Sequence, residues 1–329
     1  MLADRVRPLE YRRLATSARL RIHLRGPLVT KGGLRAGDAQ RDVHQRLLEA
    51  MKLWRWKYAP RAKMAVSFRF YDFEKNHPDV HRLVKFYLDA LKRTAFHDDR
   101  QVHYLDVSTH RVQPGKHESS LFLSVWRLAD YERMVHLGKQ VEAPEGDSDR
   151  FPSHIYLLHP DDWEHAARQH QALAGSPILS HSAAAGLPSL MDLFKDAYPL
   201  IFDLGALPSA EGTSRFRDRV REAMQGHAAE GNLLSHIYVP VELNAQVTKQ
   251  AVGLAKDLDN VMEIVCPMFT QTLMHPKAYI SGYRVYVIDD PEMPPRLSIQ
   301  LLPAGAVEAY TREIEARFEA YGEQLENAF

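Results

Sequence analysis

Two periodic patterns of apolar and polar positions alternate along the first 130 residues. Alternation at every second residue predicts a strand, whereas apolar residues three or four positions apart predict one face of a helix. Two helices are predicted, one from Asp42 to Lys52 and one that opens at Asp79, since aspartate is favoured at a helix start. Four strands are predicted around them, at residues 19–28, 62–71, 102–107 and 120–126.

The same order of elements, strand, helix, strand, helix, strand, strand, recurs in the second half of the chain. Its members are predicted at residues 199–204, 216–224, 233–243, 257–273, 279–288 and 297–302. Asp79 and Asp257 hold the same place in this order, so the period is about 180 residues, far too long for a solenoid. We therefore predict a tandem duplication with an α+β fold, in which two α/β sandwich halves form a pseudo-dimer about an approximate two-fold axis.

The predicted organisation has three parts. Residues 1–135 form the first domain, residues 136–195 a linker with a helical segment, and residues 196–329 the second domain with a C-terminal helix. The polar, acidic stretch at 142–153 marks the start of the linker. The C-terminal helix, from Glu308 to Leu325, is amphipathic and either packs on the core or binds a partner.

Charge is distributed unevenly, although the whole chain has 42 basic and 42 acidic residues. Residues 1–130 contain 26 Lys and Arg against 14 Asp and Glu, a balance of +12, which leaves 16 against 28, or −12, for the rest. A basic region attracts a phosphate backbone, because binding releases condensed counterions. The alternative is that the two halves attract each other.

The charged first residues, the lack of a long apolar run and the single cysteine together predict a cytoplasmic protein. The first residues are charged and lack the apolar stretch of a signal peptide, and no run of about 18 apolar residues exists to span a membrane. Cys266 is the single cysteine, so an intramolecular disulfide is excluded.

Four short motifs carry a resemblance to a known family. The first half reads PDVHRLVK at 78–85, LDAL at 88–91 and HDD at 97–99, and the second half reads DLDN at 257–260. This pattern resembles the RusA-type Holliday junction resolvases, whose helix opens with Asp-x-Asp-Asn-Leu-x-x-Lys and whose Asp-Asp pair follows about 20 residues downstream. The resemblance implies two tandem RusA-like halves, the second one diverged, and a metal-dependent endonuclease of DNA recombination and repair that acts on branched double-stranded DNA.

The resemblance also implies the site residues. The catalytic candidates are Asp79, Lys85, Asp98, Asp99, Asp257 and Asp259. The candidate ligands of Mg²⁺ or Mn²⁺ are Asp79, His81, Asp98, Asp99, Asp257 and Asp259. Neither half carries the full family set: the first has His81 and Arg82 in place of Asp and Asn, and the second has Glu263 for Lys and Pro276-Lys277 for Asp-Asp.

Clustered carboxylates suit Mg²⁺ and Mn²⁺, which are hard ions that prefer oxygen ligands, and an imidazole at His81 favours Mn²⁺. Asp98 and Asp99 follow the far end of the helix that Asp79 opens. We therefore predict a composite site, in which Asp257 and Asp259 join Asp98 and Asp99. The competing arrangement keeps Asp79, His81 and the Asp pair together within the first half.

Other readings of these residues stay open. Asp79 and Asp257 are also ordinary helix N-caps, and Lys85 with Asp89 is also a surface ion pair. His77, His81 and His97 suggest zinc, but they lack a fourth ligand. The LWRWK stretch at 53–57 either stacks on bases or packs in the core. The rival function is a catalytically inactive DNA-binding or structural protein, present as a monomeric pseudo-dimer or a homodimer.

Overall fold

The computed structural model describes thirteen stretches of the chain: residues 2–17, 19–30, 36–54, 56–57, 60–72, 80–111, 118–139, 201–203, 213–230, 240–249, 257–274, 278–289 and 296–327. The chain divides into two compact units, unit 1 with Met1–Pro152 and Glu308–Phe329, and unit 2 with Ser153–Val307. Each unit has a four-stranded sheet with helices packed against it.

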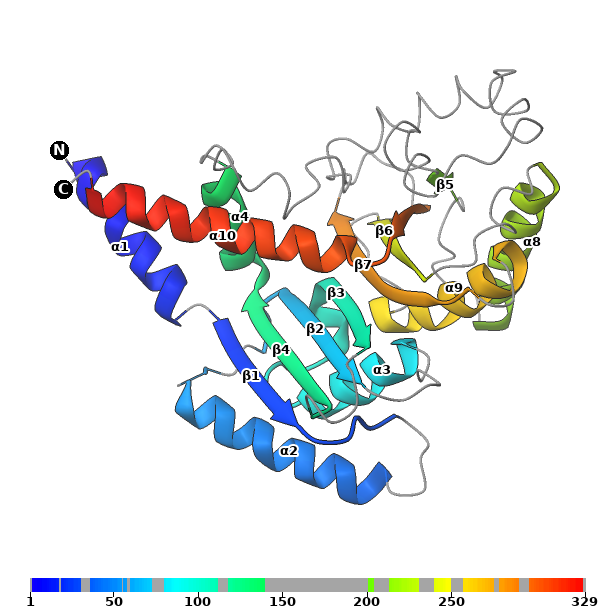
Figure 1. Ribbon diagram of the computed structural model, residues 1–329, viewed down its shortest axis with the longest axis horizontal. Helices are drawn as coiled ribbons and strands as arrows, with labels where there is room; N and C mark the ends of the chain where they lie inside the picture. Colours follow the sequence, from blue (N-terminus) through cyan, green and yellow to red (C-terminus); the bar gives the residue numbers. More distant parts are fainter. Residues whose placement is uncertain are drawn as a thin grey trace. The chain divides into compact units, whose positions relative to one another are not determined.

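The sheet of unit 1 contains β1 (Arg19–Arg25), β2 (Met64–Asp72), β3 (Val102–Arg111) and β4 (Ser120–Arg127), as Figure 1 shows. Their order across the sheet is β1-β4-β2-β3. β4 pairs antiparallel with both β1 and β2, whereas β2 and β3 are parallel. A parallel pair needs a crossover between its strands, and here the crossover is a helix.

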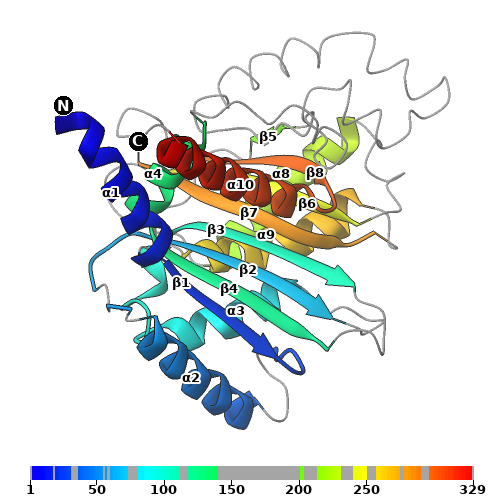
Figure 2. The same cartoon turned by 60° about the vertical axis from the view of Figure 1, so that its left-hand side comes forward.

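Helices α2 (Ala36–Leu53) and α3 (Val80–Leu91) lie on one face of this sheet (Figures 1 and 2). The strand side chains that face these two helices are apolar and alternate with polar ones, so this face of the sheet is excluded from solvent. The core on this side consists of Leu20, Ile22, Val43, Leu47, Met64, Val66, Phe68, Phe70, Leu83, Val84, Tyr87, Leu88, Leu91, Leu105, Val107, Leu121, Leu123 and Val125, all buried.

Three further helices pack together in unit 1: α1 (Leu2–Ser17), α4 (Leu128–Lys139) and the part of α10 (Ala306–Asn327) that begins at Glu308. Arg133 on α4 donates two hydrogen bonds to Glu10 on α1, at 2.8 and 3.1 Å. Tyr11 on α1 packs on Phe318 of α10, with ring centroids 4.9 Å apart. Gly322 permits this approach, because a Cβ there would lie 2.1 Å from Cζ of Tyr11.

Polar contacts attach α10 to the strands of unit 1. Glu308 is almost fully buried and lies 2.7 Å from Nε2 of His110 on β3, and Arg312 also pairs with it. One turn further on, the hydroxyl of Thr311 donates to the buried Asp106 at 3.0 Å. The C-terminal helix predicted at residues 308–325 therefore packs on the first half of the chain, although it follows the second half in sequence.

Unit 2 repeats the strand order of unit 1. It contains β5 (Ile201–Asp203), α8 (Thr213–Glu230), β6 (Val241–Lys249), α9 (Leu258–Leu273), β7 (Ile280–Asp289) and β8 (Arg296–Pro303). The order β5-β8-β6-β7 matches β1-β4-β2-β3, and β6 with β7 is again the parallel pair. The parallel pairs even share a register shift at their first residue, after Met64 in β2 and after Val241 in β6.

The α+β fold class predicted from the sequence is confirmed by these two mixed sheets with their helices. Matched strand orders agree with a tandem duplication, but the duplication and the two-fold arrangement stay predictions, as do the three domain boundaries. No helix within the described stretches is long and apolar enough to cross a membrane.

One predicted strand in the second half ends too early. The strand expected at 233–243 overlaps β6 at 241–243, and β6 continues to Lys249, while residues 231–239 lie outside the described stretches. The prediction followed the apolar run LLSHIYV. β6 instead alternates apolar residues with Glu242, Asn244, Gln246 and Thr248, which are polar yet buried. Helices α1 and α4 were not predicted.

We expect Glu308→Gln to destabilise the fold by about 1–3 kcal/mol at pH 7, because it removes a nearly buried carboxylate from its cationic partners. Burial would raise the pKa of Glu308, but the hydrogen bond and charge of His110, with Arg312 and Arg69, outweigh it and lower the pKa from 4.5 to about 2. This contribution is therefore fully present above pH 4.5 and is lost as pH falls from 4.5 to about 2.

Urea unfolding followed by circular dichroism at pH 7 and pH 3 measures both effects. Glu319→Gln, on the exposed side of the same helix, is the matched control. A wild-type protein and a Glu308→Gln variant with the same stability at pH 7 would contradict the assignment.

Candidate functional site

The turn after α3 positions two adjacent acidic residues, Asp98 and Asp99. Arg93 has a left-handed backbone (φ 65°), which ends the helix. The hydroxyl of Thr94 donates to the carbonyls of Ala90 and Leu91, at 3.0 and 2.6 Å, and so satisfies two of the helix's last acceptors. The chain then leads past the fully buried Phe96 into Asp98 and Asp99, just before β3.

A capping box holds this acidic pair at the start of a short 3₁₀ helix, η1 (Asp99–Gln101). The Asp98 carboxylate accepts a hydrogen bond from the backbone N–H of Arg100 at 3.0 Å. The amide oxygen of Gln101 accepts from the backbone of Asp98 and His97, and its Nε2 donates to the carbonyl of Ala62 at 2.7 Å. The position of the pair is therefore determined by the backbone around it.

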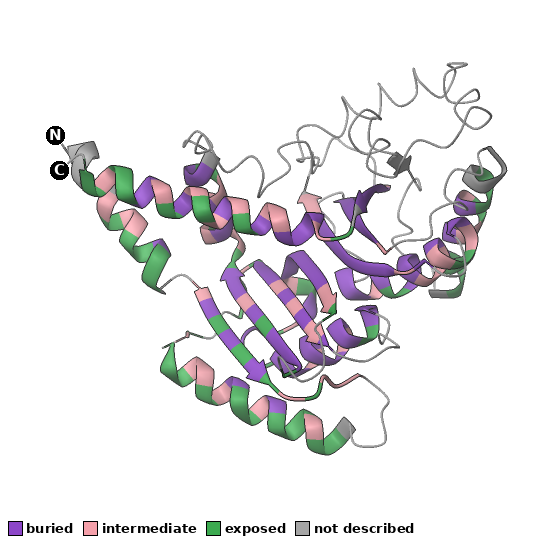
Figure 3. Ribbon diagram, viewed as in Figure 1, coloured by how far each residue is buried: buried purple, intermediate pink, exposed green. Residues whose placement is uncertain are grey.

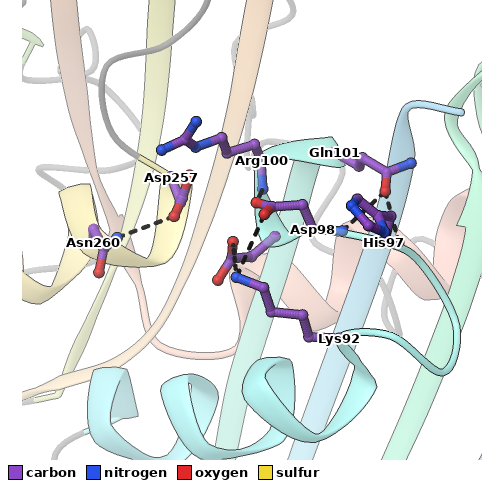
Figure 4. Close-up of polar contacts among 8 residues, drawn as sticks. Lys92, His97, Asp98, Arg100, Gln101, Asp257 and Asn260 are labelled. Carbon is purple, nitrogen blue, oxygen red and sulfur yellow. Dashed lines mark hydrogen bonds and ion pairs between the residues drawn. The ribbon is translucent and has the colours of Figure 1, made fainter. Parts of the chain in front are cut away.

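Lys92 brings a positive charge to the pair, as Figure 4 shows. Its Nζ lies 3.0 Å from Oδ1 of Asp99, which is buried, and 3.6 Å from Oδ2 of Asp98. A hydrogen bond with the Asp99 side chain and the N–H of Arg100 lower the pKa of Asp98 from 3.8 to about 2, against an opposing effect of burial. Asp98 is thus ionised at neutral pH. Sequence reasoning missed Lys92, because only the fold brings its ammonium to residues 98 and 99.

The candidate site residues in the first turn of α3 lie at the opposite end of this helix from Asp98 and Asp99. His81 is buried, Arg82 is exposed and Lys85 is partly exposed, while Asp79 lies outside the described stretches. From His81 to Leu91 the helix rises about 15 Å, and Lys92 with its two aspartates follows Leu91. Unit 1 therefore does not bring His81 together with Asp98 and Asp99. His97 is likewise beyond the far end of α3, so the zinc grouping with His81 does not form.

In unit 2 the matching helix start carries two carboxylates. Asp257 occupies the N-cap position of α9, but its side chain makes no capping hydrogen bond. Its Oδ2 instead accepts from Nδ2 of Asn260 at 3.2 Å, which Figure 4 also shows. Asp259 is 3% exposed, and its charge is one of the causes, after burial and Cys266, that raise the pKa of Tyr283.

The second-half departures from the family pattern are only partly visible. Glu263, which stands where the family has lysine, is exposed on α9, and Pro276 and Lys277 lie outside the described stretches. The explanation of Asp257 as a simple helix N-cap is weakened, because its carboxylate accepts a hydrogen bond from the Asn260 side chain and none from the helix backbone.

The aromatic stretch at 53–57 supports the turn after α3. Nε1 of Trp56 donates to the carbonyl of Ala95 at 3.1 Å, so this ring has a packing role. Trp54 is 39% exposed, and Arg55 lies outside the described stretches. The two tryptophans thus have different surroundings, and only Trp54 presents a large exposed surface.

Unit 1 is thus a mixed α/β domain with a carboxylate pair fixed just before strand β3. The family model described as "Endodeoxyribonuclease RusA" matches residues 36–117. This stretch includes α2, β2, α3, the Asp98-Asp99 pair and β3. The match confirms the RusA resemblance for residues 36–117, and it ends well before unit 2.

Two other comparisons add nothing to this assignment. No curated protein matches the chain. Among solved structures, the chain is aligned with "Crystal Structure of Hydrogenase Maturation Protein HypE" at 11% identity, over 91% of this chain and 75% of that one, with a TM-score of 0.18. A TM-score this low does not indicate a shared fold.

We expect Lys92→Met to lower the free energy of unfolding by about 1–3 kcal/mol, because the buried Asp99 carboxylate loses a charged hydrogen-bond donor. Chemical denaturation at neutral pH measures this change. Arg93→Met alters the neighbouring exposed cation and serves as the control. Equal losses in the two variants would show that Lys92 does not stabilise the acidic pair.

Proposed function

We propose that this protein is a divalent-metal-dependent endonuclease that cuts branched DNA, with four-way junctions as its main substrate. The observation that carries the proposal is the RusA family match, which contains the ordered Asp98-Asp99 pair. The basic first half, +12 over residues 1–130, suits the phosphate backbones that meet at a junction. A role in DNA recombination and repair, in the cytoplasm, follows from this substrate.

The acidic pair has the chemistry of a Mg²⁺ or Mn²⁺ site. Two adjacent carboxylates supply hard oxygen donors, and the pair already attracts a cation, since the Lys92 ammonium lies within 3.6 Å of both side chains. The chemistry that a bound Mg²⁺ or Mn²⁺ supplies is activation of water and neutralisation of charge at the phosphate. Lys92 must yield part of its contact with Asp99 for the pair to take up an ion.

The length of α3 supports one of the two possible compositions of the site. Because His81 and the acidic pair lie at opposite ends of the helix, about 15 Å apart along its axis, the first-half arrangement of all four residues is disfavoured. Asp257 and Asp259 open the corresponding helix of unit 2 and retain the family's Asp-x-Asp-Asn pattern. We propose that they complete one composite carboxylate site with Asp98 and Asp99. The remaining set, with Asp79, His81, Pro276 and Lys277, then lacks the carboxylates for catalysis.

A single working site has a consequence for the reaction. Resolving a four-way junction takes two coordinated nicks, whereas one composite site makes one. We therefore expect a nick per chain, and full resolution only when two chains act on one junction. We propose that Lys85, which is partly exposed on α3, neutralises phosphate charge beside the second, non-catalytic set of residues.

A catalytically inactive DNA-binding protein is the second candidate. It is favoured by the incomplete family set in each half, with His81 and Arg82 in one and Pro276 and Lys277 in the other. Binding of branched DNA without turnover distinguishes this candidate from the nuclease.

We expect the protein to cut a labelled four-way junction in Mg²⁺ or Mn²⁺ and not to cut the matching linear duplex. EDTA and Asp99→Asn should each reduce the rate at least about 100-fold, because both remove the metal or its ligand. Asp38→Asn, on the exposed surface of α2, is the matched control. Tight junction binding with no cutting in either metal would favour the inactive protein.

The pair Asp257→Asn and Asp259→Asn tests the composite site. These isosteric changes preserve side-chain volume, which matters because Asp259 is buried. We expect junction cutting to fall as far as in Asp99→Asn, while junction binding in EDTA stays within about threefold of the wild type, since the charge change is small. Full cutting by a folded double variant would exclude these carboxylates from the site.

A further inference from the structure

Four aromatic rings form a continuous row across the sheet of unit 1, one from each strand. His23 on β1 stacks on Phe122 on β4, with centroids 4.0 Å apart and planes at 11°. Phe122 meets Tyr71 on β2 edge to face at 5.5 Å, and Tyr71 stacks on His110 on β3 at 4.8 Å. We call these residues, His23, Phe122, Tyr71 and His110, the aromatic row.

The aromatic row lies on the face of the sheet opposite α2 and α3. Strand alternation requires this, because the neighbours Ile22, Leu121, Leu123 and Phe70 point into the core. Phe122 is 44% exposed, and His23 is exposed as well. Figure 3 shows exposed positions that alternate with buried ones along β1 and β4. A large aromatic side chain thus remains open to solvent at the centre of the row.

Arginines surround the exposed part of the row. Arg21 and Arg25 are exposed and flank His23 on the same face of β1, because they are two residues away on either side. Arg69 on β2 is the register partner of Phe122. The acidic Glu308 near Tyr71 is already paired with His110 and Arg312. The exposed face therefore combines planar rings with a positive charge.

Phe122 has no ionisable group, and burial favours the uncharged form of two other rings of the row, His23 and Tyr71. Burial, followed by the charge of Arg25, lowers the pKa of His23 below its ordinary value of 6.5. Burial, followed by the charge of Glu308, raises the pKa of Tyr71 above 10. Uncharged rings stack on bases, while the arginines supply the contacts to phosphate.

We propose that the aromatic row and its flanking arginines bind an unpaired DNA strand, with bases stacked on the rings and phosphates on Arg21 and Arg25. A paired duplex hides the faces of its bases, so the rings favour unpaired nucleotides, which occur where DNA branches. This proposal deepens the proposed function, from which it takes DNA as the partner. It is separate from the acidic pair, and its residues are not in the candidate site.

Binding of a labelled oligothymidylate, measured by fluorescence anisotropy in EDTA, tests the proposal without any cutting. We expect Phe122→Ala to weaken binding about tenfold or more, because one stacked base is lost, and Phe122→Tyr to restore it, because tyrosine keeps the ring. Arg21→Gln with Arg25→Gln should reduce the slope of log K against log salt by about 1.4. Arg41→Gln, on the exposed side of α2, is the control for loss of one exposed charge.

Three results would overturn the proposal. The first is unchanged oligothymidylate affinity in a folded Phe122→Ala or Phe122→Leu variant, which would leave the row as a set of cross-strand pairs that stabilise the sheet. The second is an equal loss of affinity for duplex and single strand. The third is a fall in molar mass by light scattering in Phe122→Ala, which would identify the face as an interface between copies of the chain.

Failure of the nuclease and failure of this surface are distinguishable. A protein that cuts no DNA, yet loses oligothymidylate affinity in Phe122→Ala, retains the surface and lacks the proposed catalysis. A protein that cuts junctions, with oligothymidylate affinity unaffected by Phe122→Ala, retains the catalysis and lacks the surface.

Discussion

Because β2 and β3 are parallel, the chain must cross from the end of one strand to the start of the other, and α3 makes that crossing. The buried face of α3 anchors the helix on the sheet, so its two ends are held apart by its own length. The left-handed residue Arg93 then turns the chain, and Asp98 and Asp99 are delivered to the start of β3. The separation of His81 from the acidic pair follows from this one packing constraint.

Electrostatic contacts in unit 1 offset charges that burial would otherwise disfavour. Asp99 is buried against Lys92, and Glu308 is buried against His110 and Arg312. In each case a carboxylate loses hydration but gains a cation at hydrogen-bond distance, which is the condition for keeping a buried charge. The two carboxylates that contact the Lys92 ammonium are also of the kind that binds a divalent ion. The acidic pair is therefore both a stabilising contact and a candidate for chemistry.

The two units share a strand order and differ in the chemistry of their polar faces. In unit 1 the sheet face that carries Tyr71 and Phe122 is partly exposed and basic, whereas in unit 2 the alternate residues of β6, including Glu242 and Asn244, are buried. Glu242 accepts hydrogen bonds from the backbone of Gly305 and Val307, where α10 begins. Gln246 and Thr248, which hold the register positions of Arg69 and Tyr71, are thus buried in unit 2, whereas Arg69 and Tyr71 are partly exposed in unit 1.

The local pattern of the sequence was sufficient to predict most helices and strands and to single out the acidic residues. Periodicity located α2, α3, α9 and the strands of unit 1, and the spacing of Asp98-Asp99 from the helix start carried the RusA resemblance. The second part of β6 was missed because its polar residues are buried, which reverses the usual relation between polarity and exposure. Only the tertiary structure decided that Lys92 meets the acidic pair, that Glu308 returns to His110 and that four separate strands align their rings in one row. Each of these is a contact set by strand register or helix packing between residues that local periodicity does not relate.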